Sequence, residues 1–132
     1  MKNRVKRLLA ATLLCVLLLT GCGGPANDAF TQVDAEKAVA MMGETPDYVI
    51  VDVRTSEEYE EEHIKGAINV PNESIGEGNI AALPDKAQPI FVYCRSGNRS
   101  KQAAAKLADL GYTNVIEFGG IKDWTGETES DK

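Results

Sequence analysis

The stretch from Cys94 to Ser100, which reads CRSGNRS, contains the residue types that a nucleophilic thiol needs. Cys94 directly follows an apolar run and precedes a short loop that leads into an alanine-rich segment. Backbone N–H groups converge where a strand passes through a loop into a helix, and the positive end of the helix dipole lies there. Arg95 and Arg99 add positive charge, and Gly97 allows successive N–H groups to turn inward as an anion nest. We therefore expect the pKa of Cys94 to lie below the free value of about 8.5.

A second group of polar residues follows another apolar run. Asp52 and Arg54 come directly after the segment 48–51. Functional groups of parallel sheets gather at the carboxyl ends of the strands, so we expect this pair to lie near the Cys94 loop. We interpret Asp52, Arg54 and Ser100 as residues that support the loop rather than react.

The segments that must position these residues alternate between strands and helices. Apolar runs at 48–51, 67–71, 89–93 and 114–118 are typical of buried strands. Helical spacing predicts a helix over 34–42, a capping box at Thr55 opens another through Glu62, and Gly111 ends a third over 100–110. Helical turns are expected at 80–83 and around Trp124. This alternation predicts one α/β domain, with a mostly parallel sheet and helices on both faces.

The acidic residues of the second helix, Glu57, Glu58 and 60–62, have the pattern of a solvated helix face, with Tyr59 pointing inward. His63, the single histidine, follows this helix directly. We interpret it as a structural residue of a turn and not as a general base.

The charge distribution restricts the partners of the protein. Its 132 residues include 14 Lys and Arg against 20 Asp and Glu, which gives a net charge of −6 and argues against nucleic acid as a partner. The window from Lys86 to Ala108 instead contains five basic residues and no acid. A local basic pocket on an acidic domain suits a small anionic substrate. One His and three Cys are too few for a His-rich or four-Cys metal site, and we expect no metal and no cofactor.

The first residues have the pattern of a bacterial lipoprotein signal. A basic segment precedes the apolar run Leu8–Leu19, which is shorter than the roughly 20 residues of a membrane span. Leu19-Thr20-Gly21-Cys22 then resembles the lipobox, which implies a signal peptide over 1–21, lipid on Cys22 and a tether over 22–29. Loss of the leader removes four basic residues and no acid, so the net charge changes from −6 to −10. We expect a lipid-anchored monomer of the cell envelope that faces the extracytoplasmic side.

Several motifs in the same order resemble a single-domain rhodanese module. They are Val51-Asp52-Val53-Arg54, Glu58-Tyr59, the segment 63–71, the loop 94–100, and Gly119-Gly120-Ile121 with Trp124. The resemblance implies a three-layer α/β/α domain over 30–126, with a central sheet of about five strands, followed by a polar tail over 127–132. It departs from the family pattern at Glu62, where the family usually has Gly, and in the short segment after Trp124.

The rhodanese resemblance also implies the roles of the site residues. Cys94 carries sulfane sulfur as a persulfide, taken from a donor such as thiosulfate and passed to a thiol or another thiophilic acceptor. The resemblance implies that the loop N–H groups hold the persulfide, that Arg95 attracts the anionic donor and that Arg99 braces the loop. Asp52 is expected to pair with either Arg99 or Arg54. The substrate-binding loop then comprises Arg95, Ser96, Gly97, Asn98 and Arg99.

Two other function classes remain open from the sequence. Cys-based phosphatases and arsenate reductases resemble this loop but use a Cys-x5-Arg spacing, whereas Cys94 and Arg99 are spaced as Cys-x4-Arg. The shorter loop suits a sulfur atom better than a tetrahedral phosphate. A binding or sensor module without turnover usually lacks the cysteine, and Cys94 is present.

Overall fold

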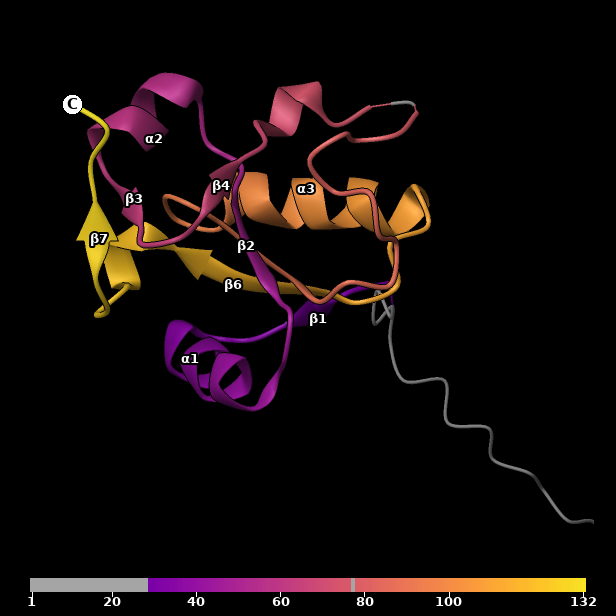
Figure 1. The fold of residues 1–132 in the computed structure, drawn as a ribbon, viewed down its shortest axis with the longest axis horizontal. Helices are drawn as coiled ribbons and strands as arrows, with labels where there is room; N and C mark the ends of the chain where they lie inside the picture. The colour runs from indigo at the N-terminus through magenta and orange to yellow at the C-terminus, as the bar shows by residue number, and fades with distance from the viewer. Residues whose placement is uncertain (1–28, 77) are drawn as a thin grey trace, which may run out of the picture.

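The computed structural model describes residues 29–76 and 78–132, and its centre is a five-stranded sheet (Figure 1). The strand order is β1–β6–β5–β2–β4, and every neighbouring pair is parallel. The strands are β1 (Thr31–Gln32), β2 (Val49–Asp52), β4 (Ile68–Asn69), β5 (Ile90–Cys94) and β6 (Val115–Gly120). The predicted α/β class and the sheet of about five strands are confirmed. The predicted signal peptide over 1–21, Cys22 and all of the tether except Ala29 lie outside the described residues.

Helices cover both faces of this sheet. Figure 1 shows α1 (Ala35–Glu44) and α3 (Asn98–Asp109) on opposite sides of the strands, with α2 (Ser56–Glu61) beside the carboxyl end of β2. The predicted capping box is present, because the Thr55 side chain accepts from the Glu58 N–H and the Glu58 side chain accepts from the Thr55 N–H. Helix α3 begins two residues before the predicted start at 100, since Gly97 turns the chain directly from the loop into the helix with φ at 109°.

The alternation of side chains along the strands produces two apolar layers. Val51 and Val92 pack with Leu107 of α3, whereas Ile50 and Phe91 pack with Ala38 of α1. Residues of β5 are buried on both faces, as the continuous apolar run predicts. Cys94 belongs to the layer under α3.

The end of the chain differs from the expected polar tail. Residues 127–132 include β7 (Thr128–Glu129), which pairs antiparallel with β3 (His63–Ile64) in a separate two-stranded sheet. The Asp131 N–H also donates to the Glu60 carbonyl at 3.0 Å. The last residues therefore hold the segment that follows α2.

Single turns connect the other elements. The 3₁₀ turns are η1 (Asn72–Ser74), which the sequence does not predict, and η2 (Ile121–Asp123), which lies where a turn near Trp124 is expected. At 80–83 the chain makes one turn, closed by a hydrogen bond from the Leu83 N–H to the Ile80 carbonyl.

In the part of the chain that the structure describes, no helix has the length and apolar character needed to cross a membrane.

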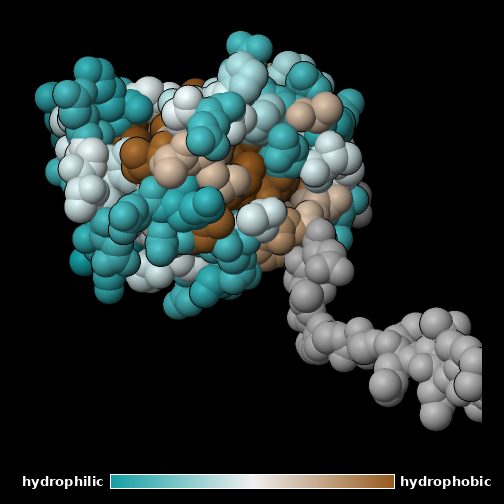
Figure 2. Space-filling view, turned by 90° about the horizontal axis from the view of Figure 1, so that it is seen from below, coloured by the Kyte–Doolittle hydropathy of each residue, from teal (hydrophilic) through white to brown (hydrophobic). Residues whose placement is uncertain are grey.

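The α1 side of the molecule carries exposed apolar side chains. Figure 2 views this side and shows them gathered at its centre, surrounded by hydrophilic residues. Val39 and Tyr48 are 48% and 39% exposed and line a cavity of about 390 Å³ there, together with Trp124. Cys94 packs in the other layer, under α3, so this cavity is separate from the predicted site.

Candidate active site

Cys94 is the last residue of β5 and is only 1% exposed. The Gly97 N–H donates to its Sγ at 3.0 Å, and the thiol contacts the Ser100 Oγ at 3.4 Å. A strand therefore delivers the sulfur to the start of a helix, where the first backbone N–H groups have no helical partner. The predicted cradle of loop N–H groups is present at the sulfur.

Opposing effects act on the pKa of Cys94. Burial alone would raise it, but hydrogen bonds from the Ser100 side chain and from the N–H groups of Ser100, Gly97 and Ser96 outweigh burial and lower the pKa. The direction expected from the sequence agrees with the structure, and the loop N–H groups contribute as expected. The hydrogen bond from the Ser100 side chain is a contribution that the sequence argument did not include.

The loop follows its path because two positions lack a side chain. Gly97 has a positive φ, and Gly120 of β6 lies directly against the loop backbone. A Cβ on Gly120 would be 1.8 Å from the Arg95 carbonyl oxygen, a separation that no packing permits. The β5–β6 register shifts between Val92 and Cys94, which places Gly120 opposite Cys94. The irregular strand pair thus lets β6 support the loop from below.

Arg99 braces the loop, with Glu58 of α2 as its partner. The guanidinium donates to both carboxylate oxygens, at 2.7 and 3.0 Å. The interpretation of Glu58 as part of a solvated face is therefore wrong, because α2 turns this residue toward α3. The hydrogen bond from Arg99 lowers the pKa of Glu58 to about 2. Since this pKa lies below the ordinary value of 4.5, the pair stabilises the fold above pH 4.5, and that stabilisation is lost as the pH falls toward 2.

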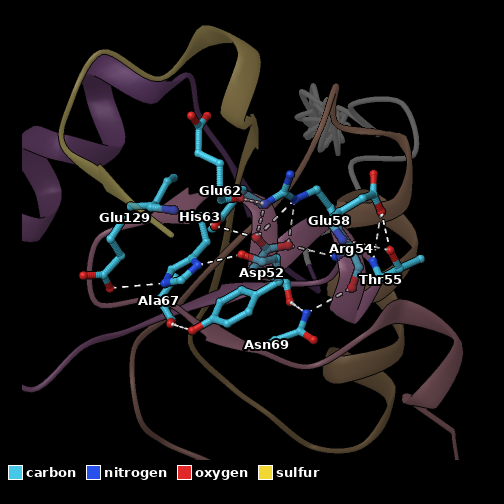
Figure 3. A network of polar contacts seen from close by, with 12 residues as sticks. Asp52, Arg54, Thr55, Glu58, Glu62, His63, Ala67, Asn69 and Glu129 are labelled. Carbon is cyan, nitrogen blue, oxygen red and sulfur yellow. Dashed lines mark hydrogen bonds and ion pairs between the residues drawn. The ribbon is translucent and has the colours of Figure 1, made fainter. Parts of the chain in front are cut away.

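Asp52 and Arg54 form a buried ion pair (Figure 3). The Arg54 side chain donates to both Asp52 oxygens, at 2.6 to 3.1 Å, and Asp52 is fully buried. The Tyr93 hydroxyl donates to the same carboxylate at 2.6 Å and accepts from the Ile64 N–H at 3.0 Å. Of the two partners expected for Asp52, the structure selects Arg54. This network ties β2 and β5 to β3 at the end of the sheet where Cys94 lies.

His63 has the structural role that the sequence suggests. Its ring stacks on Tyr59 with centroids 3.8 Å apart, and its Nδ1 lies 2.7 Å from the Tyr59 carbonyl. Its Nε2 lies 3.2 Å from a carboxylate oxygen of Glu129 in β7. Both ring nitrogens are thus engaged away from Cys94, in the contact between α2 and the end of the chain.

Glu117 of β6 is a site residue that the sequence analysis does not single out. It is 2% exposed, and its Oε1 accepts from the Ser100 hydroxyl at 2.6 Å and from the Gly119 N–H at 2.8 Å. Its signal in the sequence is a carboxylate within the apolar run 114–118. Such a residue is almost never buried without a partner.

The surface beside the Cys94 loop carries both signs of charge. A cavity of about 290 Å³ beside the loop is lined by Arg54, Glu58, Glu61, Glu62, Arg95, Ile121 and Lys122. The expectation of a local basic pocket needs correction, because α2 brings carboxylates to the wall that Arg95 and Lys122 share. The exposed Arg95 is the cation of the loop on this wall, whereas Arg99 is neutralised by Glu58.

The structure thus brings together most of the residues predicted for the site. Gly97, Ser100 and the Ser96 N–H lie around the Cys94 sulfur, and Arg99 braces the loop. Arg95 lines the cavity beside the loop, and the pair Asp52–Arg54 binds Tyr93, the residue before Cys94. Asn98 begins α3 and is exposed. Cys22 lies outside the described residues. Within residues 29–76 and 78–132, His, Cys, Asp and Glu side chains form no cluster that could hold a metal ion.

Comparisons with known proteins identify the family. The rhodanese-like domain family matches residues 34–127. The thiosulfate sulfurtransferase PspE of Escherichia coli is 45% identical over 73 residues, which cover 55% of this chain and 70% of that protein. The thiosulfate sulfurtransferase GlpE of Actinobacillus succinogenes is 36% identical over 97 residues, which cover 73% and 85%.

Solved structures agree with this match. A rhodanese with anions from Escherichia coli superposes with a TM-score of 0.58 at 40% identity, covering 63% of this chain and 98% of that one. The chain spans less than half the length of some other curated relatives that it matches. With the fold, the Cys94 loop and the family match in agreement, the chain belongs to the rhodanese-like family.

Proposed function

We propose that this protein is a sulfurtransferase that takes sulfane sulfur from an anionic donor such as thiosulfate and passes it to a thiol acceptor through a persulfide on Cys94. The observation that carries this proposal is the Gly97 N–H, which points at the Cys94 sulfur from 3.0 Å at the start of α3. The names of PspE and GlpE as thiosulfate sulfurtransferases support the same chemistry.

The geometry suits both halves of this reaction. The Cys94 thiolate attacks the outer sulfur of thiosulfate, a new S–S bond forms, the old one breaks, and sulfite leaves with the bonding electron pair. The terminal sulfur of the persulfide is an anion, and the loop N–H groups can stabilise it as they stabilise the thiolate. An acceptor thiolate then attacks that sulfur, and Cys94 leaves as a thiolate ready for the next turnover.

Mass spectrometry tests this proposal directly. The purified full chain is treated with thiosulfate, digested under non-reducing conditions, and analysed for the peptide that contains Cys94. We expect this peptide to gain one sulfur atom and to lose it when a thiol acceptor is added. Absence of the added sulfur, with turnover of an aryl phosphate, would instead favour the phosphatase class. Absence of both would favour a binding module.

Arg95→Ala should weaken binding of the donor. Three cations, Arg54, Arg95 and Lys122, and three carboxylates line the cavity beside the loop, so loss of Arg95 leaves its lining net negative. We expect the KM for thiosulfate at low salt to rise by about tenfold, which corresponds to about 1.4 kcal/mol, with kcat little changed. Steady-state kinetics at two ionic strengths measures the effect. An unchanged KM at low salt would exclude this role, and Lys37→Ala on α1 is the matched control.

We also propose that a lipid on Cys22 holds the domain at a membrane of the cell envelope. The support is the lipobox-like segment 19–22 behind a basic and apolar leader. We expect the chain to fractionate with membranes and the Cys22→Ser variant to lose this association. A membrane-bound Cys22→Ser variant would contradict the lipid anchor without affecting the assignment of Cys94. Outside the cytosol, the acceptor would be a dedicated thiol protein, since no glutathione pool maintains reduced thiols there.

A further inference from the structure

The carboxylate of Glu117 lies under the Cys94 loop and contacts it through Ser100. Its Oε1 is 2.6 Å from the Ser100 Oγ, and it would lie 3.8 Å from a Cβ built on Gly97. The Gly119 N–H donates to the same oxygen at 2.8 Å and fixes its position. None of the reaction steps described above uses this buried group.

The Ser100 hydroxyl has one proton and several acceptors within reach. It lies 2.6 Å from Glu117 Oε1, 3.0 Å from the Gly97 carbonyl and 3.2 Å from the Gly119 carbonyl. The contact with Glu117 is the shortest, and hydrogen bonds to a charged acceptor are the stronger ones. The Ser100 proton therefore points to Glu117, which leaves the Ser100 oxygen free to accept the Cys94 S–H at 3.4 Å. Sulfur, hydroxyl and carboxylate form a continuous chain of hydrogen bonds.

We propose that Glu117 is a positioning residue that takes up the proton of Cys94 through Ser100. In this step the Cys94 S–H bond breaks and its proton binds to the Ser100 oxygen, while the Ser100 proton passes to Glu117 Oε1. The products are a thiolate, a serine hydroxyl that now donates to it, and a neutral carboxylic acid. The group keeps one negative charge throughout, and the buried thiol becomes a nucleophile without releasing its proton to water.

Glu117 is the group that can accept the proton, because Glu58 and Asp52 are already paired with arginines. Arg99, whose charge acts on Cys94, is bound by Glu58 on α2, and Asp52 on β2 is bound by Arg54. Strand β1, on the other side of β6, carries only Thr31 and Gln32. Among the described residues that the structure places in contact with Ser100, Glu117 is the carboxylate.

The test is the pH dependence of Cys94 alkylation by iodoacetamide, followed by mass spectrometry of the Cys94 peptide from the full chain. Alkylation needs no sulfur donor, so its result tests the role of Glu117 separately from the proposed sulfur transfer. In Glu117→Gln, the Gly119 N–H keeps an oxygen next to Ser100, but the amide cannot take up a proton. We expect the alkylation profile to move to higher pH, with about a tenfold loss of rate at pH 6, which is the effect of a pKa higher by about one.

The direction of this shift separates the alternatives. If Glu117 acts only as a fixed negative charge, its removal stabilises the thiolate and moves the profile to lower pH. If it acts only in packing, the midpoint does not move. Either result would overturn the proposal. Glu57→Gln, an exposed change on α2 with the same chemistry, is the matched control and should leave the profile in place.

Variants of Ser100 provide an independent test, which can still be carried out if the Glu117→Gln variant does not fold. Ser100→Ala removes the hydroxyl that links the two groups and should shift the profile to higher pH, whereas Ser100→Thr keeps a hydroxyl and should restore much of the rate. Where all chains fold, the double variant Ser100→Ala/Glu117→Gln should lose no more rate than Ser100→Ala alone, because both act through one path. Additive losses, or equal rates in the Ala and Thr variants, would contradict the relay.

Discussion

We expect Cys94→Ser to abolish sulfur transfer from thiosulfate to cyanide, the acceptor in the assay, and to leave the fold intact. The variant has no sulfur atom that could carry the persulfide, so we expect activity to fall to the background of the reaction without enzyme. Serine is slightly smaller than cysteine and can still bond to Ser100 and to the Gly97 N–H, so the free energy of unfolding should change by no more than about 1 kcal/mol. Thiocyanate formation and urea unfolding measure the two quantities.

The Cys22→Ser variant is the matched control for this experiment, because it makes the same chemical change outside the domain. We expect it to keep full transfer activity in solution. Residual activity of Cys94→Ser at the wild-type level would show that another group carries the sulfur. If activity is lost together with the folded state, the Cys94→Ala variant separates chemistry from packing.

Arg54→Met should produce the largest loss of stability among single changes around the site. It removes the guanidinium from a carboxylate that is fully buried, and Asp52 then keeps the Tyr93 hydroxyl and one backbone N–H as donors. Removal of one partner of a buried ion pair typically costs about 3–5 kcal/mol. The free energy of unfolding of a small domain is about 5–15 kcal/mol, so the variant should lose a large part of it. Urea unfolding at pH 7 measures the change.

Arg95→Met is the matched control for stability, since Arg95 is exposed. Its effect on the free energy of unfolding should lie within about 0.5 kcal/mol. The double change Asp52→Leu/Arg54→Met removes both charges and should recover part of the loss, because no unpaired charge stays buried. A stability of Arg54→Met equal to that of the wild type would show that the Asp52 carboxylate finds another partner.

Local patterns suffice to predict the Cys94 loop and the elements around it. Four apolar runs, three helical patterns and one cysteine between a strand and a helix all act over short stretches of sequence, and the structure contains each element. Gly97 and the capping box at Thr55 also act through neighbours in the chain. The two-residue strands β1, β3 and β7 are missed because no apolar run marks them, whereas the run 67–71 marks β4, which is equally short.

The partners of the loop depend on distant parts of the chain. Glu58 lies 41 residues from Arg99, and Glu117 lies 17 residues from Ser100. Nothing in the order of residues selects Glu58 from the four acidic residues of α2. The packing of α2 against the start of α3 selects it. A carboxylate in a buried strand indicates that a partner exists, but the packing of α3 on β6 is what identifies Ser100 as that partner.

Strand β7 determines where a label can be attached to this protein. The final residues pair with β3 (Figure 1). The Ser130 hydroxyl and the Asp131 N–H donate to the Glu60 carbonyl on α2. A fusion partner or affinity tag directly after Lys132 would pull on the helix that supplies Glu58 to the loop brace. Removal of the last five residues would release β3 and expose the ring of His63. Probes for imaging or purification should therefore be attached away from Lys132.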